Sequence, residues 1–243
     1  MVMLMERDLL FSQKFTSIED FQFNERVARV FPDMIKRSIP GYSALVSNIG
    51  SLADYYALND SNIYDLGCSL GAVSLSIQHR LSKTGCQIIA VDNSADMLER
   101  AKDFIETEDY PTPIRLQQQN LEQTTVENAS VVIMNFTLQF IAPAERLTVL
   151  RNIYSGLKPG GILIVSEKEA LETDTEWMNE LHLNFKRVQG YSELEISQKR
   201  KALENVMITD SLAVHLQRFK NAGFSRVEKW FQCFNFLSII AQK

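Results

Sequence analysis

One short segment constrains the fold of this chain more than any other. A short strand-like run at residues 63–66 leads into the turn GCSLG at residues 67–71, and an amphipathic segment follows directly. Glycine suits such a turn because it adopts unusual backbone angles and lets a ligand approach the backbone closely. The pattern therefore predicts a strand, a tight turn and a helix whose N-terminus faces a ligand.

A carboxylate after the next apolar run indicates the kind of ligand. Residues 87–91 have the composition of a strand, and Asp92 ends it, 21 residues beyond Gly71. In dinucleotide-binding folds a carboxylate at about this spacing accepts hydrogen bonds from the ribose hydroxyls. The two features together predict a cofactor that contains adenosine.

Two positions around the turn separate the candidate cofactors. The dinucleotide fingerprint is G-x-G-x-x-G, whereas here Ser69 takes the place of the middle glycine and Asp65 precedes Gly67 by two residues. Asp65 would repel a pyrophosphate, but it can hold a cationic amino group directly or through water. S-adenosylmethionine (SAM) has an ammonium, a sulfonium and an adenosine but no phosphate, so the charges favour SAM over NAD. A purely structural turn is the alternative at this point.

Strands and helices alternate along most of the chain, with short connections between them. This alternation predicts a parallel sheet with helices on both faces and a ligand at the carboxyl ends of the strands. Gly67, Asp92, Asn120 and Asn135 all fall at such ends. Strands are expected at 63–66, 87–91, 114–118, 130–135 and 162–167, helices near 72–81, 95–107 and 144–157, and a closing hairpin at 226–231 and 236–241.

Two helical regions extend this pattern within one expected domain, residues 1–243. Residues 22–58 have helical periodicity that is punctuated by Pro32 and by the Pro40–Gly41 pair. Residues 171–223 form an insertion, expected to be a lid or a dimer arm. Three helices are expected in the insertion, at 174–188, 192–207 and 210–222.

Composition excludes several classes of function. The net charge of −5 provides no basic field for nucleic acid, and no apolar run reaches the roughly 18 residues of a membrane span. The three cysteines are widely spaced without a C-x-x-C pair, and the three histidines lack ligand spacing. We therefore expect reduced thiols, no metal and a cytoplasmic protein that binds neither nucleic acid nor membrane.

Longer motifs resemble known enzymes. The strand–turn–helix YDLGCSLG, together with VDNS, NFTLQF and LKPGG, resembles the SAM-dependent class I methyltransferases with their Rossmann-like fold. More specific are VFPDMIKRSIPGYS at residues 30–43, GYSELEISQKR with ALENVM at 190–207, and WFQCFNF at 230–236. From about residue 23 onward, the chain resembles the carboxy-S-adenosyl-L-methionine synthase family.

The resemblance implies an unusual reaction. The family converts SAM and prephenate into carboxy-SAM and phenylpyruvate, and the carboxyl group lost by prephenate ends on the sulfonium methyl. A carbon next to S⁺ can lose a proton to form an ylide, and the ylide carbon can attack carbon dioxide. A water-poor pocket would keep both reactive species from being lost. The resemblance also implies a homodimer, and a tRNA-modifying carboxymethyltransferase that uses the product to make 5-oxyacetyl uridine at the wobble position.

The family's contacts transfer to individual positions of this chain. Arg200, in SQKR, matches the family's arginine that binds the new carboxylate. A guanidinium can bind a planar carboxylate through two hydrogen bonds, so it suits this role better than an ammonium group. Arg200 and Tyr42 are the candidate catalytic residues. The candidate SAM-binding residues are Tyr42, Gly67, Cys68, Ser69, Asp92, Asn93, Asn120, Leu121, Asn135 and Arg200.

One position departs from the family pattern. The family usually carries Asp-Ile after the third strand, where this chain has Asn120-Leu121. The amide oxygen of Asn120 can still accept a hydrogen bond from the adenine amino group, so weaker but intact recognition is expected. Two alternatives stay open. One is an ordinary methyltransferase acting on a small molecule or tRNA, and the other is a non-enzymatic SAM-binding partner of the tRNA-modifying enzyme.

Overall fold

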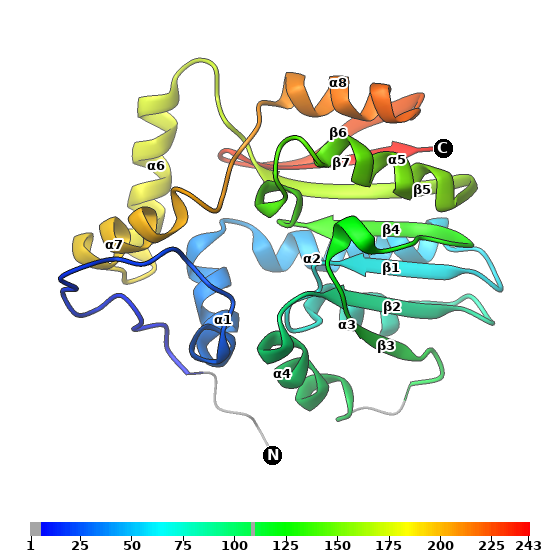
Figure 1. Ribbon diagram of the computed structural model, residues 1–243, viewed down its shortest axis with the longest axis horizontal. Helices are drawn as coiled ribbons and strands as arrows, with labels where there is room; N and C mark the ends of the chain where they lie inside the picture. The colour runs from blue at the N-terminus through cyan, green and yellow to red at the C-terminus, as the bar shows by residue number, and fades with distance from the viewer. Residues whose placement is uncertain (1–5, 108–109) are drawn as a thin grey trace.

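The computed structural model describes residues 6–107 and 110–243 and contains a seven-stranded sheet (Figure 1). Its strand order is β3-β2-β1-β4-β5-β7-β6, with β1 to β5 parallel and β7 antiparallel to both β5 and β6. The expected parallel sheet with a C-terminal hairpin is confirmed. The strands are β1 (Asn62–Leu66), β2 (Gln87–Asp92), β3 (Ile114–Gln118), β4 (Ala129–Asn135), β5 (Leu157–Lys168), β6 (Arg226–Cys233) and β7 (Phe236–Gln242).

Helices cover both faces of the sheet because the central strands are buried on both sides. Along β4, Val131 and Ile133 pack in the core beneath α2 and α3, while Val132 and Met134 pack in the core beneath α5 and α8. The helices are α1 (Glu25–Ser38), α2 (Tyr42–Tyr56), α3 (Ala72–Gln78), α4 (Ala95–Ile105), α5 (Arg146–Gly156), α6 (Thr175–Val188), α7 (Glu193–Leu203) and α8 (Leu212–Ala222), with short 3₁₀ turns η1 (Leu121–Gln123) and η2 (Leu138–Phe140).

Most helices are shorter than expected by one to four residues at an end, and α7 ends at Leu203 instead of residue 207. Two further differences have a clear physical reason. Pro32 lies inside α1 rather than interrupting it. The helix tolerates the lost backbone hydrogen bond because Val27, Val30 and Met34 bury one of its faces, and such packing supplies most helical stability in proteins. The fifth strand also begins earlier than expected, at Leu157, because that end pairs with Ala129 of β4.

The three helices of the insertion are present but lie in different places. A capping box starts α7, with the Ser192 hydroxyl accepting from the Glu195 backbone N–H and the Glu195 carboxylate accepting from the Ser192 N–H. Figure 1 shows α6 and α7 beside α1 at the end of the molecule toward which β1 and β4 run. Helix α8 instead packs on the sheet next to α5 and buries Phe219 and Ala222.

The topology brings two loops together. Strand β1 lies between β2 and β4, so the strand order reverses there and a crevice opens at the carboxyl ends. The loop after β1 meets the loop after β4 closely, since a Cβ atom on Gly67 would lie 2.3 Å from Cγ2 of Thr137. These two loops form the floor of the candidate site.

Candidate functional site

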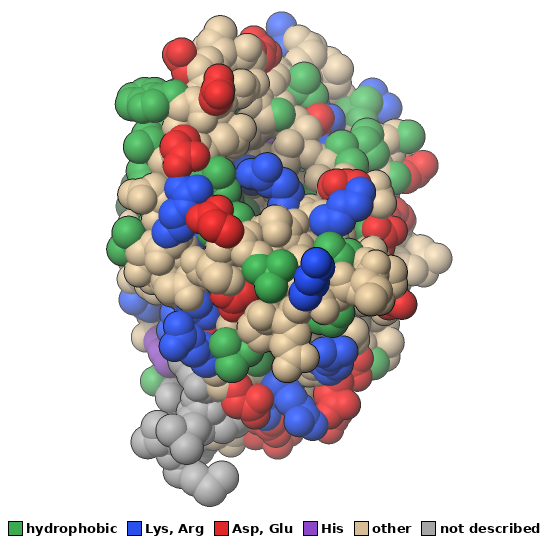
Figure 2. Space-filling model, turned by 90° about the vertical axis from the view of Figure 1, so that its left-hand side faces the viewer, with side chains coloured by type: hydrophobic (Ala, Val, Ile, Leu, Met, Phe, Trp, Pro, Cys, Tyr) green, Lys and Arg blue, Asp and Glu red, His purple; other side chains and the backbone are tan. Residues whose placement is uncertain are grey.

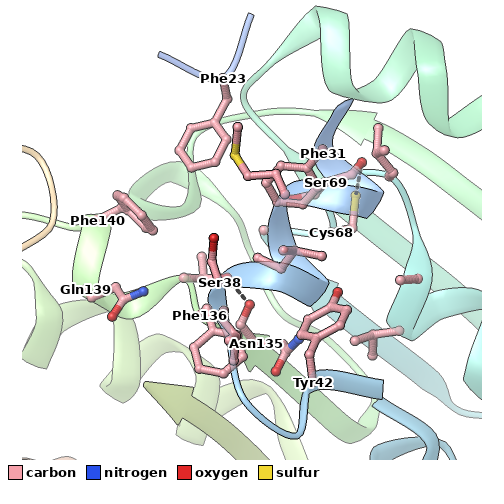
Figure 3. A pocket seen from close by; sticks show the side chains of 18 of the residues that line it. Phe23, Phe31, Ser38, Tyr42, Cys68, Ser69, Asn135, Phe136, Gln139 and Phe140 are labelled. Atoms are coloured by element: carbon pink, nitrogen blue, oxygen red, sulfur yellow. Dashed lines mark hydrogen bonds between the residues drawn. The ribbon is translucent and has the colours of Figure 1, made fainter. Parts of the chain in front are cut away.

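A cavity of about 430 Å³ opens at this crevice. This volume is within the range of cavities that bind small molecules. Its walls come from the N-terminal segment, α1, the start of α2, the loops after β1, β2 and β4, the end of β5, and α6 and α7. Figure 3 shows side chains of α1 and of the two loops converging on it.

The loop after β1 has the backbone angles expected of a ligand-binding turn. Gly67, Ser69 and Gly71 have φ values of +81°, +49° and +80°. The Asp92 carboxylate holds the turn in place, because its Oδ2 accepts from the Ser69 N–H at 2.8 Å and its Oδ1 from the Ser94 N–H at 2.9 Å. Burial raises the pKa of Asp92 although these hydrogen bonds oppose the shift. Asp92 therefore shapes the turn and also lines the cavity.

Asp65 places a second carboxylate in the wall. Its Oδ2 accepts from the Ser74 N–H at 3.0 Å and from the Ser74 hydroxyl at 2.6 Å. Burial is the main reason why its pKa rises to about 6, and the charge of Asp92 adds to the rise. Tyr42, at the start of α2, is also buried, and burial together with the charge of Asp65 raises the pKa of its hydroxyl. A cationic ligand group would relieve this accumulation of negative charge.

The loop after β4 offers an unused acceptor. The buried Oδ1 of Asn135 has no hydrogen-bond partner among the described residues, and Asn135 lines the cavity. A buried polar atom without a partner is costly, so a ligand donor at this position would stabilise the site. Phe136 follows with φ of +61° and its ring lies 6.4 Å from that of Tyr42. Figure 3 shows Asn135, Phe136 and Tyr42 grouped on one side of the cavity.

Aromatic side chains from the segment before α1, from α1 and from η2 form an apolar wall of the cavity. Phe23, from the segment before α1, contacts Phe140 of η2 edge to face, with ring centroids 5.2 Å apart. Phe31 of α1 lies 6.2 Å from Phe23. All three rings line the cavity (Figure 3) and give this part of the wall an apolar surface.

The structure assembles most of the residues that the sequence indicated. The candidates that line the cavity are Tyr42, Gly67, Cys68, Ser69, Asp92, Asn93, Leu121 and Asn135. The Cys68 thiol is buried, and this burial together with Asp65 and Asp92 raises its pKa.

Two candidates lie outside the cavity wall. Asn120 is exposed and is not among the lining residues, and its Oδ1 accepts from Nδ2 of Asn93, which does line the cavity, at 3.2 Å. Arg200 is exposed on α7, where its neighbour Lys199 takes the inward position. Arg200 is not among the residues that line the cavity, although its charge acts on Lys168 and Lys186 of the wall, so its role toward a carboxylate stays a prediction.

Several polar residues of the wall were not expected from the sequence, and four of them lie on β5, α6 and α7. Lys168 ends β5, His182 and Lys186 lie on α6, and Lys199 lies on α7. The position of Lys168 at the end of a parallel strand, and that of Lys199 in the SQKR motif, were available signals. Their meaning depends on burial, which the sequence does not show.

Comparison with known proteins identifies the family. Residues 63–161 match the family model of a methyltransferase domain. Carboxy-S-adenosyl-L-methionine synthases of Aliivibrio fischeri (strain MJ11), Vibrio cholerae (strain M66-2) and Klebsiella pneumoniae (strain 342) are 53%, 54% and 51% identical to this chain. The alignments cover 97–98% of this chain and of the relatives. The chain belongs to the carboxy-S-adenosyl-L-methionine synthase family.

Solved structures outside the carboxy-S-adenosyl-L-methionine synthase family share the fold. Human N-acetylserotonin methyltransferase in complex with SAM superposes with a TM-score of 0.62 at 18% identity over 90% of this chain and 55% of that one. An O-methyltransferase family protein of Burkholderia thailandensis gives 0.64 at 14% identity over 94% and 65%. The Rossmann-like class I methyltransferase fold is thus confirmed.

Within residues 6–107 and 110–243, no three His, Cys, Asp or Glu side chains are grouped so that they could hold a metal ion. In the same ranges no helix has the length and apolarity needed to cross a membrane.

Proposed function

We propose that this protein converts SAM and prephenate into carboxy-SAM, phenylpyruvate and water. The observation that carries the proposal is full-length identity above 50% to carboxy-S-adenosyl-L-methionine synthases of three bacteria. The cavity supports it, because its acidic and orphaned acceptor groups suit a cationic adenosine compound that has no phosphate. SAM is consumed in this reaction and is therefore treated as a substrate.

The wall residues have distinct tasks toward SAM. The backbone turn that begins at Gly67 receives the methionine part, and Asp65 supplies a negative charge for its ammonium group. Asp92 and Asn93 suit the ribose hydroxyls and the adenine edge. The unpartnered Oδ1 of Asn135 accepts from a donor of the ligand. These side chains act by positioning and charge, without covalent catalysis.

The chemistry balances without an added oxidant or metal. Prephenate loses its ring carboxylate as carbon dioxide and its ring hydroxyl as hydroxide, and phenylpyruvate forms. The hydroxide takes a proton from the sulfonium methyl and becomes water. The resulting ylide carbon then bonds to carbon dioxide. The rings of Phe23, Phe31 and Phe140 keep bulk water from trapping either reactive species.

We also propose the cellular setting that the family implies. The protein forms a homodimer, and a carboxymethyltransferase uses its product to make 5-oxyacetyl uridine at the tRNA wobble position. A cytoplasmic location fits the three free cysteines.

Mass spectrometry of a reaction with methyl-¹³C SAM and prephenate tests the proposal. The expected product is heavier than labelled SAM by one carbon dioxide and retains the label. An Asp92→Ala variant, which lacks the expected ribose contact, serves as the negative control. Formation of S-adenosylhomocysteine together with a labelled acceptor would instead indicate an ordinary methyltransferase. Tight SAM binding with no product would indicate a SAM-binding partner subunit.

A further inference from the structure

Three lysines from three different elements line one side of the cavity: Lys168 at the end of β5, Lys186 on α6 and Lys199 on α7. The side chain of Lys199 is only 9% exposed. Figure 2 views the molecule from the side on which α6 and α7 lie, and both Lys or Arg and Asp or Glu side chains stand around a hollow in that face. The concentration of cationic residues is therefore a property of the cavity wall, where the three lysines lie.

Among residues 6–107 and 110–243, Lys168 and Lys186 have no acidic partner of the kind that buried cations normally have. Burial, followed by the positive charges of Lys199, Lys168 and Arg200, lowers the pKa of Lys186 to about 7. Burial and the charge of Arg200 also lower the pKa of Lys168. In neither case does an acidic side chain oppose the shift. Lys199 is partly compensated, with Nζ 3.6 Å from Oδ2 of Asp8 and donating to the Ser38 hydroxyl at 2.9 Å. Uncompensated buried cations are costly unless an anion joins them.

A continuous set of contacts joins the lysines to the SAM side of the cavity. Ser38, which bonds Lys199, also accepts through its backbone oxygen from Nε2 of His182 at 2.9 Å. The His182 ring lies 4.9 Å from Phe236, and Phe236 lies 6.0 Å from Phe136. Burial and the nearby cations lower the pKa of His182 to about 3, so this imidazole stays neutral and adds no charge. An aromatic surface thus separates an acidic end from a cationic end.

We propose that Lys168, Lys186 and Lys199 form the carboxylate subsite for prephenate, with its ring held against Phe136 and Phe236. The inference rests on the proposed function, since that function supplies the substrate. Prephenate carries two carboxylates, and SAM carries net positive charge at the reacting sulfonium. A cavity with acids at one end and lysines at the other therefore orients the two substrates oppositely. When the lysines hold one carboxylate of prephenate, the other carboxylate, which leaves as carbon dioxide, lies toward the sulfonium of SAM.

The alternative occupant of the lysine side is the carboxylate of SAM itself. The two possibilities differ in a measurable way. If the lysines bind prephenate, neutralising one of them weakens prephenate binding alone. If they bind the methionine carboxylate, the same change weakens SAM binding as well.

Calorimetry on the enzyme saturated with S-adenosylhomocysteine, which has no methyl to react, separates these outcomes. Prephenate is titrated into wild type, Lys168→Gln and Lys186→Gln, with Lys220→Gln on the exposed face of α8 as a charge-matched control. We expect the Kd for prephenate to rise at least about tenfold in the first two variants, as for loss of a buried ionic contact, and to stay unchanged in Lys220→Gln. The Kd for SAM should change less than about twofold in every variant.

Several results would overturn the subsite. They are absence of prephenate binding by the wild type, equal binding by all four proteins, or an equal loss of SAM and prephenate binding in the lysine variants. Thermal unfolding of each variant shows whether a loss comes from misfolding, and Lys199 is left intact because its contact with Asp8 also serves the fold. Binding is measured without turnover, so failure of the subsite is distinct from failure to form carboxy-SAM.

Discussion

At the scale of single residues, burial decides what a side chain does in this cavity. Asp65 was expected to attract a cation on account of its charge, but the folded chain surrounds it with apolar groups and with Asp92. Its pKa of about 6 means that a substantial fraction is protonated in mildly acidic solution. Local sequence indicates the charge, and the surroundings determine the pH range over which it is present.

A pH dependence of SAM binding follows from Asp65. Because its pKa is raised to about 6, the carboxylate is present at pH 7 and is lost as the pH falls below 6. We expect the Kd for SAM to increase about tenfold between pH 7 and pH 5, the change for one unit below the pKa. An Asp65→Asn variant should bind weakly at both pH values. Calorimetry at the two pH values checks this, and a flat wild-type profile would contradict the role of Asp65.

At the scale of elements, two buried ionisable side chains, Glu167 and Arg146, hold the loop after β4. The backbone N–H of Leu138 donates to Oε1 of Glu167 at 2.9 Å. Arg146 is fully buried and donates to the backbone oxygens of Ile141 at 2.9 Å and Gln139 at 3.2 Å. It also bonds Asp210 at 2.5 Å, in the connection between α7 and α8. One guanidinium therefore couples the cavity loop to the insertion.

Glu167 makes this loop a source of pH-dependent stability. Burial raises its pKa to about 8 although Arg146 and the loop N–H groups oppose the shift. A raised pKa means that its stabilising contribution is complete below about pH 4.5 and is lost as the pH rises to about 8. Glutamine cannot ionise, so the stability of Glu167→Gln relative to wild type should increase from pH 5 to pH 8, by at most about 4 kcal/mol for one group over three pH units.

Urea denaturation at pH 5 and pH 8 provides the measurement for Glu167. The exposed Glu228→Gln variant on β6 is the matched control, and its stability relative to wild type should not change with pH. If the Glu167→Gln difference were equally independent of pH, the carboxyl group would be ionised throughout. The account of this loop would then be wrong.

At the scale of the whole molecule, the exposed position of Arg200 makes the oligomeric state important. Trp177 and Val188 of α6 are also exposed, at 65% and 75%. In the proposed homodimer these surfaces are available for contact between subunits. An arginine that does not line its own cavity can then serve the cavity of its neighbour.

Mixing two inactive variants tests this arrangement. Arg200→Ala should bind SAM normally but fail to retain carboxy-SAM, and Asp92→Ala should lose SAM binding. If Arg200 acts in the partner's cavity, mixed dimers regain up to about a quarter of wild-type activity, because each contains one complete site. Light scattering must show a dimer. If mixing restores no activity although dimers are present, Arg200 acts in the cavity of its own subunit.

Much of the architecture was predictable because it depends on local patterns. Apolar runs marked the strands, and the turn that begins at Gly67 marked the first β–turn–α unit. Helix boundaries were less accurate where packing outweighs local preference. Pro32 is the example, because the buried face of α1 carries the helix past it.

The candidate site was predictable to the same extent. Residues next to a strand end, such as Ser69, Asp92 and Asn135, line the cavity as expected. Asn120 also follows a strand, but its side chain turns to Asn93 instead. Strand ends determine where a residue lies, and they do not determine which way its side chain points.

The sequence by itself determined the fold class, the turn for an adenosine-containing substrate and the family, because each follows from backbone preferences and motifs carried by neighbouring residues. Only the tertiary structure decided that Lys168, Lys186 and Lys199 share one wall and that Arg200 lies outside it. It also decided the protonation of Asp65 and Glu167. The physical reason is that desolvation and charge–charge interactions depend on distances in space between residues far apart in the chain.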